Sequence, residues 1–225
     1  MSSWPLIICW DLDHTLGNFT SLILDRGATS GIRHGISGVL ERLAQLGVQH
    51  VLTTTGSRLY ASSVLERTGL RHRIPRIFSG DEIDAGSGKR YRPVAQAFGL
   101  TDLDAVRRMV VIGDLIYDQP ADIDGLVFVH QPAGYCTEAV VLEDLLARLL
   151  AAGSGDVQAG FVTLHTQMGA PLPLPDGCRA TMQWRNPHAS GPVPRLAANL
   201  RIPLITIEFT DTPRYGDDTA LGRMR

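Results

Sequence analysis

Two short acidic segments hold the residues with the clearest chemical potential in this sequence. Asp11-Leu12-Asp13-His14-Thr15 places two carboxylates two residues apart, and Gly113-Asp114-Leu115-Ile116-Tyr117-Asp118 places two more four residues apart. A carboxylate can attack phosphorus as a nucleophile, and a neighbouring carboxyl can protonate the leaving oxygen and later activate water. Each segment taken alone is also compatible with acidic turn or cap residues, so the case depends on whether the two segments meet.

Each acidic segment directly follows a short apolar run, residues 6–10 in the first case and 109–112 in the second. Such runs are typical of strands buried on both faces of a parallel sheet, and ligands bind beyond the carboxyl ends of strands in such sheets. Several carboxylates brought together there repel one another unless a cation neutralises them. Mg²⁺ prefers carboxylate oxygens and water, so the sequence predicts a bound Mg²⁺.

Two further segments offer groups that could hold a phosphoryl group. Thr53, Thr54 and Thr55 end a predicted strand, where a hydroxyl and the following amides can face an anion, although threonine is also a good strand former. Lys89 lies in the glycine-rich loop Gly86-Ser87-Gly88-Lys89, where an ammonium can balance carboxylates and phosphate. A solvated loop lysine is the alternative. The loop is not a nucleotide-binding P-loop, because Ile83 replaces its first glycine and Arg90 follows the lysine.

Apolar periodicity predicts alternating strands and helices over the first two thirds of the chain. The predicted strands are residues 6–10, 48–54, 76–78, 109–112 and 126–129, and the predicted helices are residues 35–46, 58–68, 93–98 and about 140–149. This alternation indicates an α/β fold, a doubly wound parallel sheet with helices on both faces.

The sequence changes character after about residue 152. Gly153-Ser154-Gly155 resembles a linker, and eight of the thirteen prolines fall between residues 157 and 225. We therefore expect no regular helix there and a small, proline-rich extension of antiparallel strands at residues 161–166, 179–184 and 204–209. The predicted division is a catalytic domain, residues 1–152, and a C-terminal extension, residues 153–225.

Composition excludes several classes of protein. The 225 residues are 44% hydrophobic and 20% charged with a net charge of -2, which gives no general attraction to nucleic acid or anionic membrane. The apolar stretch at residues 4–10 is too short for a signal peptide or a membrane span, so a cytoplasmic location is expected. Cys9, Cys136 and Cys178 are too dispersed for a disulfide framework or a zinc site.

Taken together, these motifs resemble those of the haloacid-dehalogenase superfamily. The resemblance comprises a strand then Asp11-x-Asp13-x-Thr15, a strand then Thr54, the loop lysine Lys89, and a strand then Gly113-Asp114-x-x-x-Asp118. It covers about residues 5–150. It implies a Rossmann-like fold and a phosphatase that works through an aspartyl phosphate, because an acid at position 13 is typical of the phosphatases and phosphomutases.

The resemblance also implies a role for each residue. Asp11 would be the nucleophile and a Mg²⁺ ligand, and Asp13 the general acid/base that lends its carbonyl to the metal. Asp114 would be a further ligand, and Asp118 would hold a metal-bound water or Lys89. The phosphoryl group would be bound by Lys89 and by Thr54 or Thr55.

The spacing leaves no room for an inserted cap domain, so the chain is similar to the capless subgroup and, more distantly, to its phosphoserine-protein phosphatase branch. The expected function is Mg²⁺-dependent hydrolysis of phosphate monoesters. A phosphotransferase and a non-catalytic module that binds a phosphorylated partner are the alternatives. The expected partner is a phosphorylated small molecule or phosphoprotein. The extension is expected to restrict access to the site or to join two copies as a homodimer, and the alternative is that it packs on the far side of the sheet.

Overall fold

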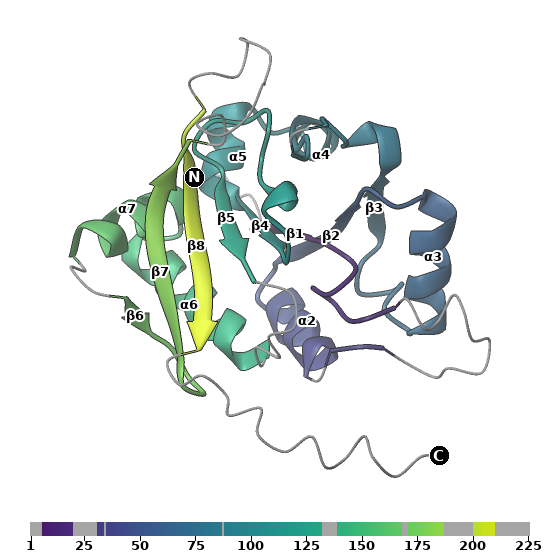
Figure 1. Cartoon of the computed structure of the whole chain (residues 1–225), viewed down its shortest axis with the longest axis horizontal. Helices are drawn as coiled ribbons and strands as arrows, with labels where there is room; N and C mark the ends of the chain where they lie inside the picture. Colours follow the sequence, from purple (N-terminus) through teal and green to yellow (C-terminus); the bar gives the residue numbers. More distant parts are fainter. Residues whose placement is uncertain are drawn as a thin grey trace, which may run out of the picture.

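A computed structural model describes residues 6–19, 31–33, 35–86, 88–131, 139–167, 171–186 and 200–209. One sheet of eight strands runs through the molecule in the order β3-β2-β1-β4-β5-β8-β7-β6 (Figure 1). The strands are β1 (Ile7–Trp10), β2 (Gln49–Thr54), β3 (Arg76–Ser79), β4 (Met109–Gly113), β5 (Val127–His130), β6 (Leu172–Pro173), β7 (Cys178–Arg185) and β8 (Ile202–Phe209). The helices are α2 (Ile36–Gln45), α3 (Arg58–Arg67), α4 (Arg92–Ala97), α5 (Asp102–Arg108), α6 (Ala139–Ala152) and α7 (Val157–Gln167), with single 3-10 turns η1 (Gly80–Glu82) and η2 (Ile116–Asp118).

The sheet is parallel from β3 to β8 and antiparallel at its far edge. β1 lies between β2 and β4, and Cys9 is in register with Val51 on one side and Val111 on the other. β8 pairs in parallel with β5 and antiparallel with β7. The predicted doubly wound α/β fold and its antiparallel C-terminal strands β7 and β8 are confirmed.

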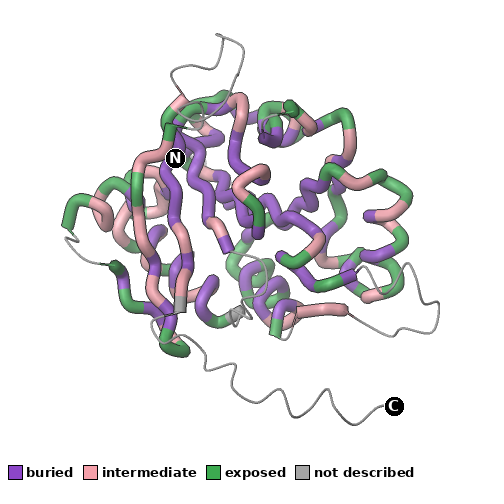
Figure 2. The backbone as a smooth tube through the Cα atoms, viewed as in Figure 1, coloured by how far each residue is buried: buried purple, intermediate pink, exposed green. Residues whose placement is uncertain are grey.

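Helices cover both faces of the sheet and create two apolar cores. Ile8 and Trp10 of β1 join the core under α2, α3, α6 and α7, whereas Ile7 and Cys9 join the core under α4 and α5. Alternate side chains of a strand point to opposite faces, so a strand covered on both sides reads as a continuous apolar run. Figure 2 shows the central strands buried along their length.

The predicted strand at residues 161–166 and the expected absence of helix after residue 152 are wrong, because α7 occupies Val157–Gln167. The Asp156 carboxylate accepts a hydrogen bond from the Ala159 amide (2.9 Å) and caps the helix. Gly160 faces α6 so closely that a Cβ would lie 1.9 Å from the Leu149 carbonyl oxygen. This glycine, which weakens a helix in isolation, therefore serves helix packing.

α5, which was not predicted, begins at the capping box formed by Thr101 and Asp104. The division into residues 1–152 and 153–225 stays a prediction, and both parts contribute strands to one sheet. No helix within the described ranges is long and apolar enough to cross a membrane.

Candidate active site

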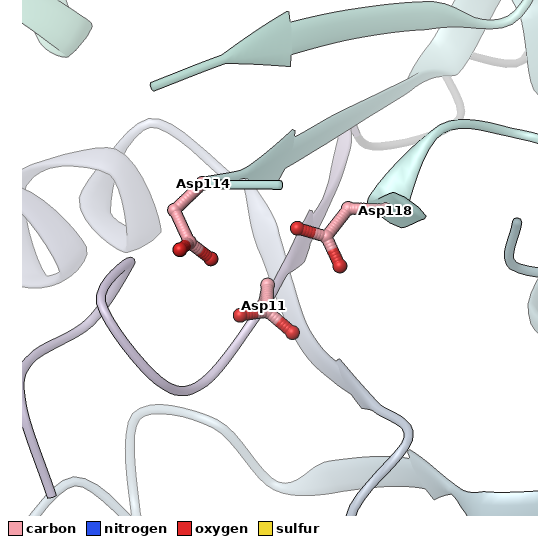
Figure 3. A group of neighbouring side chains, drawn as sticks. All are labelled: Asp11, Asp114 and Asp118. Carbon is pink, nitrogen blue, oxygen red and sulfur yellow. The ribbon is translucent and has the colours of Figure 1, made fainter. Parts of the chain in front are cut away.

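The candidate site lies where β1 and β4 end side by side. The Asp11 amide donates a hydrogen bond to the Ile112 carbonyl (2.9 Å), which fixes the first residue after β1 against the end of β4. Asp114 follows β4 at once, and Asp118 closes the turn η2 beyond it. In Figure 3 these three carboxylates face one another, and one ligand oxygen from each lies within 4.8 Å of the others.

Lys89 supplies the positive charge at this cluster. Its ammonium nitrogen lies 2.6 Å from Asp11 Oδ1 and 2.7 Å from Asp118 Oδ1, and it donates to the Thr53 carbonyl at 2.8 Å. The side chain is only 1% exposed. It is also the single lysine among 225 residues, in a chain whose other cationic side chains are arginines. An ammonium is a compact point charge, whereas a guanidinium is a planar fork that would not fit the same three acceptors.

The backbone holds Lys89 in place through the chain segment that follows η2. The Lys89 amide donates to the Gln119 carbonyl (3.0 Å), and the Ala121 amide donates to the Lys89 carbonyl (2.9 Å). Asp122 accepts hydrogen bonds from the amides of Tyr91 (2.8 Å) and Arg92 (2.9 Å), so it anchors the next turn of the lysine segment. The lysine loop and the Asp118 turn therefore form one unit.

The electrostatics of the cluster indicate an excess of negative charge. Burial raises the pKa of Asp11 to about 7, with Lys89 opposing the shift and Asp118 adding to it. Burial, with the Asp118 carboxylate, raises the pKa of Asp114 to about 6. Burial tends to lower the pKa of Lys89, but Asp11 and Asp118 outweigh this effect and raise it, so the lysine stays charged.

The donor set fits a hard divalent cation. Asp11 and Asp114 contribute buried carboxylate oxygens, and a cation bound there would offset the burial and the repulsion from Asp118 that raise their pKa values. Both oxygens of Asp118 already have partners, since Oδ1 faces Lys89 and Oδ2 accepts from the Leu115 amide (3.0 Å). Of the two predicted roles of Asp118, the contact with Lys89 is the one this geometry supports.

Gly113 is required for this arrangement of Asp118. A Cβ at position 113 would lie 2.3 Å from Asp118 Oδ2 and 2.5 Å from Asp118 Cβ. No real side chain fits that space, because such distances are far below van der Waals contact. Glycine before Asp114 therefore lets the Asp118 carboxylate fold back over the end of β4.

The structure gives the three threonines different surroundings. Thr53 is fully buried, and its hydroxyl donates to the Trp10 carbonyl (3.2 Å). Thr54, the last residue of β2, is 4% exposed, and its hydroxyl oxygen accepts from the Gly56 amide (3.1 Å), which leaves the hydroxyl proton for an anion. Thr55 is exposed beyond the strand.

Of the four predicted site aspartates, Asp13 is the one whose carboxyl lies outside the group of three carboxylates that the described residues form. Its Oδ1 accepts a hydrogen bond from the Tyr60 phenol at 2.7 Å. This contact could not be inferred from residue types and spacing, because Tyr60 lies 47 positions away in the first turn of α3. The backbone carbonyl of Asp13, which the sequence analysis expected to face the metal, is independent of this side-chain contact.

Comparisons with known proteins found similarity among solved structures. No family profile and no curated protein matches the sequence. Solved structures that match include a haloacid-dehalogenase-like hydrolase from Xanthomonas campestris, 15% identical, over 69% of this chain and 98% of that one (TM-score 0.49). A haloacid-dehalogenase-superfamily hydrolase from Ehrlichia chaffeensis is 11% identical over 66% and 100% of the two chains (0.47). A predicted phosphatase from Clostridium acetobutylicum is 15% identical over 57% and 85% (0.44).

All of these similarities are distant. At such identities and TM-scores they carry no argument about activity, which must come from the site itself.

Proposed function

We propose that this chain is a Mg²⁺-dependent phosphohydrolase that cleaves phosphate monoesters through an aspartyl phosphate on Asp11. The observation that carries the proposal is the position of Asp11. Its buried carboxylate touches Lys89 at 2.6 Å and lies in one cluster with Asp114 and Asp118 at the ends of parallel strands. A nucleophile, an immobilised cation and metal-ligating oxygens are the components that phosphoryl transfer requires.

In the first half-reaction, an Asp11 carboxylate oxygen attacks phosphorus, and the bond between phosphorus and the ester oxygen breaks. Asp13 gives its proton to the departing oxygen, so an alcohol leaves. In the second half-reaction, Asp13 takes a proton from water, the water oxygen attacks phosphorus, and inorganic phosphate leaves with the Asp11 carboxylate restored. Lys89 and the Thr54 hydroxyl hold phosphoryl oxygens during both halves.

Bound Mg²⁺, held by Asp11, Asp114 and the Asp13 carbonyl, would supply neutralisation of the phosphate and carboxylate charges. The carboxyl groups must be ionised to hold it, and the raised pKa values of Asp11 and Asp114 mean that protons compete with the metal.

No separate cap domain lies between β2 and β4 in the described residues 49–86 and 88–113. The proposed substrate is a phosphorylated small molecule or a phosphoprotein.

The test is hydrolysis of 4-nitrophenyl phosphate by the purified protein with and without Mg²⁺. We expect turnover that a chelator abolishes, and loss of essentially all turnover in Asp11→Asn with the fold retained in circular dichroism. A phosphoenzyme that forms in the wild type, is cleaved by hydroxylamine and is absent from Asp11→Asn would support the acyl phosphate. Full activity in excess chelator, or near-normal rates in Asp11→Asn, would refute the proposal.

A further inference from the structure

We infer that Tyr60 is a positioning residue for the general acid/base, Asp13. The Tyr60 phenol contacts one oxygen of the Asp13 carboxyl and so holds the other oxygen toward the leaving group. The inference rests on the proposed function and adds to it a residue outside the four motifs. It starts from one contact, the hydrogen bond from Tyr60 Oη to Asp13 Oδ1 at 2.7 Å.

The backbone places Tyr60 with little freedom. Ser57 caps α3, and its hydroxyl oxygen accepts from the Tyr60 amide at 3.2 Å, which fixes the first turn directly after β2. The ring packs on the core beneath α3 and lies against Gly56, where a Cβ would approach Tyr60 Cδ1 to 3.1 Å. The phenol oxygen is therefore held by both the helix start and the ring packing.

The surroundings of Asp13 explain why it needs such a partner. Lys89 orients Asp11 and Asp118 through its ammonium, but within the described residues the side-chain partner of Asp13 is the Tyr60 phenol. Asp13 is also only partly buried, at the edge of the cluster, so packing alone does not select one rotamer. A carboxyl that rotates freely spends part of its time away from the ester oxygen, and misplacement of a catalytic group is costly.

The direction of this hydrogen bond determines which Asp13 oxygen does the chemistry. Tyr60 donates to Oδ1, so the proton that Asp13 delivers is carried by Oδ2. Burial, together with the Asp13 and Asp11 carboxyls, raises the pKa of Tyr60, so the phenol keeps its proton and remains a donor. The contact then persists in both half-reactions, while Oδ2 gives up a proton and regains one.

The test is a double-mutant cycle measured on aryl phosphates whose leaving groups range from 2,4-dinitrophenol to unsubstituted phenol. Tyr60→Phe removes one oxygen and keeps the ring on Gly56. We expect kcat for phenyl phosphate to fall roughly 10-fold while kcat for the dinitrophenyl ester hardly changes, because only a poor leaving group needs the proton. In an Asp13→Asn background, Tyr60→Phe should add no further loss.

Tyr117→Phe is the matched control. Its phenol donates to the Asp84 carboxylate on the lysine loop, a contact of the same kind, so any loss it causes should be equal across the ester series. Melting temperatures of the four cycle proteins report whether Tyr60 and Asp13 are coupled in the folded chain, independently of turnover.

Equal losses on all esters in Tyr60→Phe, or losses that multiply with those of Asp13→Asn, would overturn the inference and leave the proposed function standing. A wild-type protein that cleaves no ester in Mg²⁺ would overturn both.

Discussion

Removal of Lys89 is the most direct physical test of the site, because it deletes the buried ammonium that contacts both Asp11 and Asp118. The change is Lys89→Met, which keeps the length of the side chain and its apolar stem. In the native protein the ammonium lies 2.6 Å from Asp11 and 2.7 Å from Asp118. These distances correspond to gross attractions of about 6 kcal/mol each at an effective dielectric constant of about 20.

Without Lys89, each pair of carboxylate oxygens within 4.8 Å would repel by about 3.5 kcal/mol at the same dielectric constant. Protonation relieves much of this, so the expected net loss is that of a broken buried ion pair, about 3 to 5 kcal/mol. For a protein of this size, that loss corresponds to a fall in melting temperature of about 6 to 20 °C.

The loss should depend on pH and on metal. A carboxyl whose pKa is raised by folding contributes stability that is lost as the pH rises through its folded pKa, here about 6 for Asp114 and about 7 for Asp11. Lys89→Met should raise the pKa values of both carboxyls further. Without metal, the stability that this variant loses relative to the wild type should therefore be larger at about pH 8 than at about pH 6. Saturating Mg²⁺ should stabilise the variant more than the wild type, because it replaces the missing positive charge.

The assay is thermal unfolding of both proteins at the two pH values, in chelator and in Mg²⁺. Arg42→Met is the matched control, since its ion pair with Glu143 has side chains 51% and 31% exposed and should contribute little to stability. If Lys89→Met unfolded at nearly the wild-type temperature at about pH 8 without metal, the carboxylates would not be ionised as argued, and the electrostatic reasoning would fail.

Three further changes test other parts of the structure. Gly113→Ala should displace the Asp118 carboxylate, lower the free energy of unfolding by about 1 to 3 kcal/mol in calorimetry and abolish turnover. Gly38→Ala in α2 is the control and should raise the free energy of unfolding by about 0.4 to 1 kcal/mol. Buried His50 accepts a hydrogen bond from the Trp10 indole (3.1 Å), and burial lowers the pKa of its imidazole. Neutral His50 therefore contributes stability that is lost as the pH falls below the pKa of the unfolded residue, about 6.5. His50→Gln should flatten that dependence in chemical denaturation, and an unchanged slope would contradict it. Truncation after Ala152 should abolish cooperative unfolding, because β5 loses β8; a soluble, cooperatively melting fragment in circular dichroism would show that residues 1–152 fold alone.

The sequence predicted the strands that carry the site because their apolar runs are short, uninterrupted and followed at once by polar residues. Parallel strands align their carboxyl ends, so Asp11 and Asp114 had to lie near one another once β1 and β4 were neighbours. The residues alone predicted neither the contact of Asp118 with Lys89, which the family resemblance offered as one of two roles, nor the contact between Tyr60 and Asp13. They depend on side-chain geometry across 29 and 47 positions, and periodicity reports only which face of an element is buried.

The C-terminal segment was harder because the same apolar pattern permits several pairings. Residues 202–205 are buried one after another, which indicates a central strand, yet Pro203 argues for an edge. The structure accommodates both signals, since Pro203 pairs with Trp184 of β7 and lies just before Leu204, where pairing with β5 begins. β8 then reaches His130 at the end of β5, whose ring nitrogen lies 3.1 Å from the Asp114 carbonyl. The described part of the extension therefore supports the Asp114 side of the site through the sheet itself, which ties the geometry of the carboxylate cluster to residues far beyond the last motif.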